Sequence, residues 1–132
     1  MLKKTSVKTS KRVEFIEITN EVRKFVSESG IREGIVVIYV PHTTCGVTVN
    51  EHADPSVVGD MIRHLGKLIP EDAGYSHLEG NSDAHIKTSI IGSSLTLIIS
   101  GGNLVLGTWQ GVFLCEFDGP RTRDVYMKII AG

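Results

Sequence analysis

The sequence predicts an α+β fold: a mainly antiparallel β-sheet or sandwich with two or so helices packed on one side. Most apolar segments are short and rich in β-branched residues, as strands are. Two longer segments instead carry the apolar spacing of amphipathic helices. The segments SGGN and DGPR are tight-turn signals between consecutive strand candidates, which favours antiparallel pairing.

The predicted elements alternate along the chain with glycine-containing turns. Strands are expected over residues 12–18, 34–40, 46–50, 94–100, 112–117 and 124–130. A first helix follows Thr19 and stops at Gly30, because its apolar residues recur at i, i+3 and i+4. A second begins with Asp54 as N-cap and Pro55 at its first position, and its apolar stripe ends before Pro70.

Length and composition indicate one globular domain over residues 1–132, with 41% hydrophobic and 22% charged residues. A formal net charge of -1 argues against a nucleic-acid or anionic-membrane partner. No apolar run approaches the roughly 20 residues that span a bilayer. The N-terminus lacks the apolar region of a signal peptide, and Cys45 and Cys115 form no CxxC motif, so we expect a cytoplasmic protein with reduced thiols.

The segment YSHLEGNSDAH carries two histidines placed symmetrically about one residue. His77 and His85 each lie four positions from Asn81, so a hairpin centred near Gly80 and Asn81 would set them opposite one another. Opposed side chains at about 4.5–5.5 Å between Cβ atoms can share one metal ion. A one-residue slip in register would send the two rings to opposite faces of the hairpin.

A third metal ligand is expected from His42 in the segment PHTTCG, at the end of a predicted strand. Three histidines with an open position are typical of catalytic zinc sites. Glu51 and Glu79 are then candidate general bases or orienting groups. The alternatives stay open here: His42 can be an ordinary strand-end histidine, and each glutamate an ordinary exposed carboxylate.

A second polar cluster, DGPRTR, suggests an anion site. If a strand begins at Pro120, Arg121 and Arg123 project from one face and can bind a phosphate or pyrophosphate. The alternative is two surface arginines beside a turn. Gln110 in GTWQG is a candidate only by neighbourhood, since this segment is otherwise explained by a core tryptophan between turns.

Taken together, four segments and the spacings between them resemble a known family, the secondary thiamine-phosphate synthase enzymes. The segments are HTTCGVTVNE, DPSVVGDM, HLEGNSDAHIK and LGTWQGVFLCEFDGPRTR, and the resemblance covers most of the chain from residue 35 to residue 130. The resemblance implies a homotrimer with intersubunit pockets and a bound divalent metal ion, zinc or magnesium. The pockets would gather a shared residue set: His42, Asn50, Glu51, His77, Asn81 and His85.

The activity that the resemblance implies is condensation of a pyrimidine diphosphate with a thiazole phosphate, which releases pyrophosphate. A metal ion and the arginine pair would offset the charge of the leaving group, and Thr44, Asn50 and Asn81 would orient the partner. Two alternatives remain: a zinc-type hydrolase of a phosphorylated or ester substrate, and a non-catalytic trimer that binds a phosphorylated metabolite or a metal.

Overall fold

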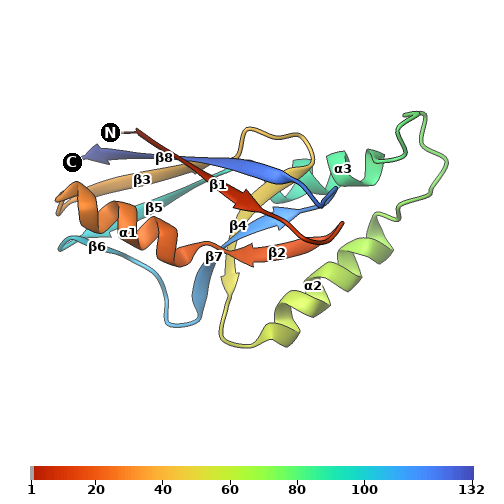
Figure 1. Ribbon diagram of the computed structural model, residues 1–132. Helices are drawn as coiled ribbons and strands as arrows, with labels where there is room; N and C mark the ends of the chain where they lie inside the picture. The colour runs from red at the N-terminus through yellow and green to blue at the C-terminus, as the bar shows by residue number, and fades with distance from the viewer. Residues whose placement is uncertain (1) are drawn as a thin grey trace.

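The computed structural model describes residues 2–132, which form two antiparallel sheets and three helices (Figure 1). The five-stranded sheet has the order β1-β8-β3-β5-β6, and the three-stranded sheet has the order β2-β7-β4. The strands are β1 (Leu2–Lys8), β2 (Glu14–Glu17), β3 (Gly34–Tyr39), β4 (Cys45–Glu51), β5 (Ser94–Ser100), β6 (Asn103–Leu104), β7 (Gln110–Glu116) and β8 (Thr122–Ala131). The helices are α1 (Thr19–Ser29), α2 (Pro55–Leu68) and α3 (Ser82–Ile91).

The main core lies between the two sheets and is closed by α1. Strand β3 turns Val36 and Ile38 into this core, and β4 and β7 contribute Val47 and Leu114 from the other sheet. Helix α1 adds its predicted apolar stripe, of which Phe25 is 4% exposed. The period of two along each strand therefore places alternate side chains in a shared apolar layer.

A second apolar cluster covers the opposite face of the three-stranded sheet. It contains Phe113 and Phe117 with Ala84 from α3, and Leu65 of α2 packs against its edge. Strand β7 is buried on both faces for this reason, which explains its nearly continuous apolar sequence. Helix α2 has no fully buried residue and contacts the sheet only along its inner side.

The predicted fold class is confirmed, and so are the first two helices. Asp54 caps α2 by accepting a hydrogen bond from the Ser56 amide at 2.9 Å. Two predictions are wrong: residues 82–91 form a third helix in place of one arm of a hairpin, and Trp109 is 63% exposed in place of a core position. Within residues 2–132, no helix is long and apolar enough to cross a membrane.

Candidate functional site

A cleft of about 460 Å³ opens where three connections meet: the loop after β3, the loop before α3 and the turn between β7 and β8. We call it the histidine cleft. It brings together most of the side chains that sequence reasoning selected. Its lining residues are Pro41, His42, Thr43, Thr44, His77, Glu79, Asn81, His85, Asp118, Arg121 and Arg123.

His77 and His85 are neighbours, although they do not face one another across a hairpin. Their ring centroids lie 5.6 Å apart at an interplanar angle of 89°. His77 comes from the loop before α3, and His85 from the first turns of the helix, which begins at Ser82. Gly80 has a φ of +77°, a conformation that turns the chain into this helix. The predicted hairpin is therefore wrong, but the two rings do meet.

His42 is held in one tautomer by the backbone of β8. Its Nε2 atom accepts a hydrogen bond from the Asp124 amide at 2.9 Å, so the proton of the neutral ring resides on Nδ1. Burial, reinforced by the nearby charge of Arg123, lowers the pKa of His42. In this geometry His42 presents an N–H donor, whereas a metal ligand needs a free nitrogen lone pair.

The predicted three-histidine metal centre is consequently not assembled as expected. Across residues 2–132, no three side chains of the His, Cys, Asp and Glu types converge closely enough to hold a metal ion. His77 and His85 form a close pair in the cleft, and the Oε2 atom of Glu79 lies 3.9 Å from His77 Nε2. Metal binding at this pair stays a prediction.

The two predicted phosphate-binding arginines have different environments. Arg121 is 53% exposed by side chain, and its guanidinium bonds to the carbonyl and carboxylate of Asp118. Arg123 is 5% exposed and pairs with buried Glu116. Burial lowers the pKa of Arg123, but the hydrogen bonds to Glu116 and the nearby negative charges together outweigh this and leave its pKa raised. Arg123 is thus buried near the start of β8 at Thr122, and of the two arginines Arg121 is the one exposed to an anion in the cleft.

Asn81 forms the back of the cleft. Its Nδ2 atom donates to Asp118 Oδ2 at 2.8 Å, which fixes the orientation of the amide. The side chain is buried, and its Oδ1 atom has no hydrogen-bond partner among the described residues. A buried acceptor of this kind normally binds a donor. Asn81 can therefore accept a hydrogen bond from a ligand.

Three predicted site residues lie outside the histidine cleft. Asn50 and Glu51 sit at the far end of β4, roughly 20 Å of strand from Thr44 at about 3.3 Å per residue. Glu51 accepts from the Ala53 amide, and Gln110 accepts from the Gly107 amide, so both close local turns. Within one chain these residues lie apart from the histidines, because strand direction separates them, so the expected grouping in a pocket between subunits stays a prediction.

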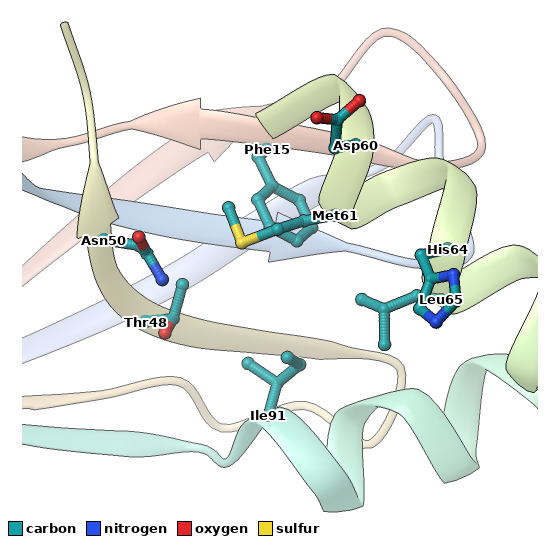
Figure 2. Close-up of a pocket in the computed structure, with 8 residues that line it drawn as sticks. All are labelled: Phe15, Thr48, Asn50, Asp60, Met61, His64, Leu65 and Ile91. Atoms are coloured by element: carbon teal, nitrogen blue, oxygen red, sulfur yellow. The ribbon is translucent and has the colours of Figure 1, made fainter. Parts of the chain in front are cut away.

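Asn50 instead borders a second cavity of about 410 Å³ between α2 and the three-stranded sheet (Figure 2). Phe15, Met61, Leu65 and Ile91 make its apolar wall, and the polar residues Thr48, Asn50, Asp60 and His64 also line it. Asp60 and His64 are the titratable residues in this lining, fewer than line the histidine cleft. We therefore take the histidine cleft as the candidate functional site.

A family model described as "UPF0047 protein YjbQ-like" matches residues 3–132. The chain belongs to the UPF0047 family. A UPF0047 protein of Methanocaldococcus jannaschii is 57% identical over 130 residues, covering 98% of this chain and 94% of that protein. YugU of Bacillus subtilis, also a UPF0047 protein, is 51% identical and covers 98% of this chain and 99% of its own length.

Solved structures of UPF0047 relatives agree with the fold. A YjbQ/UPF0047 protein of Clostridium acetobutylicum superposes with a TM-score of 0.95 at 54% identity, covering 96% of this chain and 98% of that one. A YbjQ-like protein of unknown function from Sulfolobus solfataricus gives 0.96 at 30% identity, with 100% and 97% covered. The resemblance to secondary thiamine-phosphate synthases is therefore wrong as a family assignment, since the matching model and these relatives are named UPF0047, YjbQ-like or YugU.

Proposed function

We propose that the histidine cleft is the active site of an enzyme that acts on a phosphorylated small molecule by group transfer. One observation carries this proposal: a close histidine pair and an accessible arginine line the same cleft. Arg121 supplies charge-assisted donors to a phosphate, and His42 adds a neutral N–H donor. Asn81 supplies an acceptor for the remainder of the substrate.

A divalent metal ion is part of this proposal, with His77 and His85 as its protein ligands. Imidazole donors suit zinc among the common divalent ions. An ion held there would offset charge on a phosphate leaving group. In the transfer step the acceptor forms a bond to the substrate carbon, the bond between that carbon and the phosphate oxygen breaks, and its electron pair stays on the leaving phosphate. The proton of the acceptor passes to Glu79, the carboxylate beside the histidine pair.

Hydrolysis is the second candidate, and the position of Glu79 favours it. Its Oε2 atom lies 3.9 Å from His77 Nε2, so this carboxylate can accept a proton from a water molecule near the histidine pair. The acceptor is then water in place of a second substrate. The two reactions share the cleft and differ only in the attacking group.

We further propose that the protein is a cytoplasmic homotrimer with sites between subunits. The outer face of the five-stranded sheet supports association, because Tyr39, Ile98 and Ile130 are about half exposed there. Assembly could also bring Asn50 and Glu51 of one chain near the cleft of another. Light scattering at three times the chain mass is expected, and a monomer would contradict the proposal.

The enzyme proposal is tested by supplying zinc with a panel of sugar phosphates and organic diphosphates, followed by ³¹P NMR. Metal-dependent turnover is expected, and His77→Ala should reduce it by at least about a hundredfold. His64→Ala is the matched control, because His64 is an exposed histidine on α2 outside the cleft.

The reaction products distinguish group transfer from hydrolysis. Release of phosphate only when an acceptor is present indicates transfer, and release in water alone indicates hydrolysis. Ligand that binds but stays unchanged over long incubation would contradict an enzyme and indicate a binding protein. Equal turnover by wild type and His77→Ala would contradict the assignment of the cleft.

A further inference from the structure

We propose that Glu116 is a positioning residue that sets both walls of the histidine cleft from beneath. The proposal rests on the proposed function only in treating the cleft as the active site. Glu116 is fully buried on β7, and sequence reasoning placed it within an apolar strand and gave it no role. Its carboxylate contacts Thr9, which follows β1, the turn after β7, and Arg123 of β8, and through Arg123 it reaches the loop that carries His42.

The first wall is the loop of His42 and Thr44, which Glu116 holds through Arg123. Glu116 Oε1 accepts from Arg123 Nε at 2.8 Å, and the Nη2 atom of Arg123 also pairs with Glu116 Oε2. The same Nη2 donates to Thr44 Oγ1 at 2.8 Å. Because Asp124 follows Arg123, this anchor lies beside the amide that donates to His42 Nε2. Glu116 thereby helps to set the His42 tautomer.

The second wall is the turn that carries Asp118 and Arg121. Glu116 Oε2 accepts from the Asp118 amide at 3.0 Å. The hydroxyl of Thr9 donates to Glu116 Oε1 at 2.8 Å and accepts from the Arg121 amide at 2.8 Å. Asp118 in turn binds Asn81 and the Arg121 guanidinium. One carboxylate therefore orients the cleft's exposed arginine and its buried acceptor.

The placement of the ion pair between Glu116 and Arg123 indicates that it orients the cleft and does not merely stabilise the fold. A buried ion pair often contributes little net stability, since removing both charges from water costs about as much as their attraction returns. A carboxylate offers about four acceptor sites, and this one uses them on Thr9, the Asp118 amide and two nitrogens of Arg123. A glutamine of the same shape keeps one oxygen and replaces the other with a donor.

The test uses Glu116→Gln in the full chain, with two readouts. Nitrogen NMR of the ligand-free protein reports the His42 tautomer, and titration with inorganic phosphate reports the anion site. We expect a mixed His42 tautomer and phosphate binding weakened at least about tenfold, the effect of losing one charge-assisted contact. Leu114→Val, a buried change on the same strand within the main core, is the control for simple destabilisation.

An unchanged His42 tautomer in Glu116→Gln, or an equal change in Leu114→Val, would overturn the proposal. If Glu116→Gln does not fold, Thr9→Val removes the hydroxyl between Glu116 and Arg121, and Thr9→Ser retains it. Weakened phosphate binding in the first and normal binding in the second supports the proposal, and equal binding overturns it. The tautomer can be measured without any ligand. If the His42 tautomer changes in Glu116→Gln but the wild-type protein binds no phosphate, the positioning role of Glu116 is supported and the proposed function is contradicted.

Discussion

At the scale of single residues, the chemistry of His42 depends on one backbone hydrogen bond. The amide of Asp124 donates to Nε2, and a protonated ring would direct an N–H at that amide. Burial and the positive charge of Arg123 both disfavour the protonated ring, so the pKa of His42 is lowered. The neutral ring is therefore the form that the fold stabilises.

From the lowered pKa of His42 we predict that the free energy of unfolding depends on pH. Because the folded pKa of His42 lies below its unfolded value of about 6.5, the unfolded chain binds more protons in acid. The contribution of His42 is fully present above that value and is lost as pH falls toward the folded pKa. Chemical denaturation should show a smaller acid loss of unfolding free energy in His42→Gln than in wild type.

The control for this measurement is His64→Gln, since His64 is exposed on α2. It should lose stability in acid as the wild-type protein does. An identical acid loss in wild type and His42→Gln would show that the folded pKa of His42 is not lowered.

The sequence predicted many of the residues that line the cleft, but not which of them are buried. Strand-end and turn positions selected His42, His77, His85 and Arg121, and all four line the cleft. The burial of Arg123 could not be predicted, because its partner Glu116 lies on a strand whose sequence indicates an apolar core.

At the scale of elements, α3 is the helix that the sequence pattern did not predict. Its buried face contains Asp83, Ala84, Lys87 and Thr88, so no apolar stripe marks a helix. Asp83 is fully buried, and two cations offset its charge. Arg12, from the segment between β1 and β2, pairs with Asp83 at 3.0 Å, and Lys87 pairs with it at 3.2 Å. These partners are set by tertiary packing, which periodicity does not report.

The junction of α3 with β4 predicts a stability effect at Gly46. A Cβ atom at Gly46 would lie 2.5 Å from the carbonyl oxygen of Gly92, which accepts from the Val47 amide. Gly46→Ala should therefore lower the free energy of unfolding by about 1–3 kcal/mol, because backbone must shift. Denaturant titration measures this change.

Gly66→Ala is the matched substitution for that experiment. Gly66 lies within α2, and a Cβ atom there meets nothing within 4 Å. Alanine should raise stability by about 0.5–1 kcal/mol through helix propensity. Two substitutions of the same kind are thus expected to act in opposite directions, and a stabilising Gly46→Ala would refute the close approach.

At the scale of the whole molecule, the fold class followed from strand periodicity and turn signals, but the partition into two sheets did not. Strand β1 pairs with β8 at the other end of the chain, with Leu2 opposite Lys128. Local sequence does not indicate such a long-range pairing. The histidine cleft depends on it, because Thr9 follows β1 and contacts Glu116.

Zinc-edge anomalous diffraction from crystals soaked in zinc tests the proposed active site most directly. We predict an anomalous peak about 2.0–2.1 Å from a ring nitrogen of both His77 and His85, and its loss in His85→Ala. No peak in the histidine cleft, or a peak that persists in His85→Ala, would contradict the proposed site.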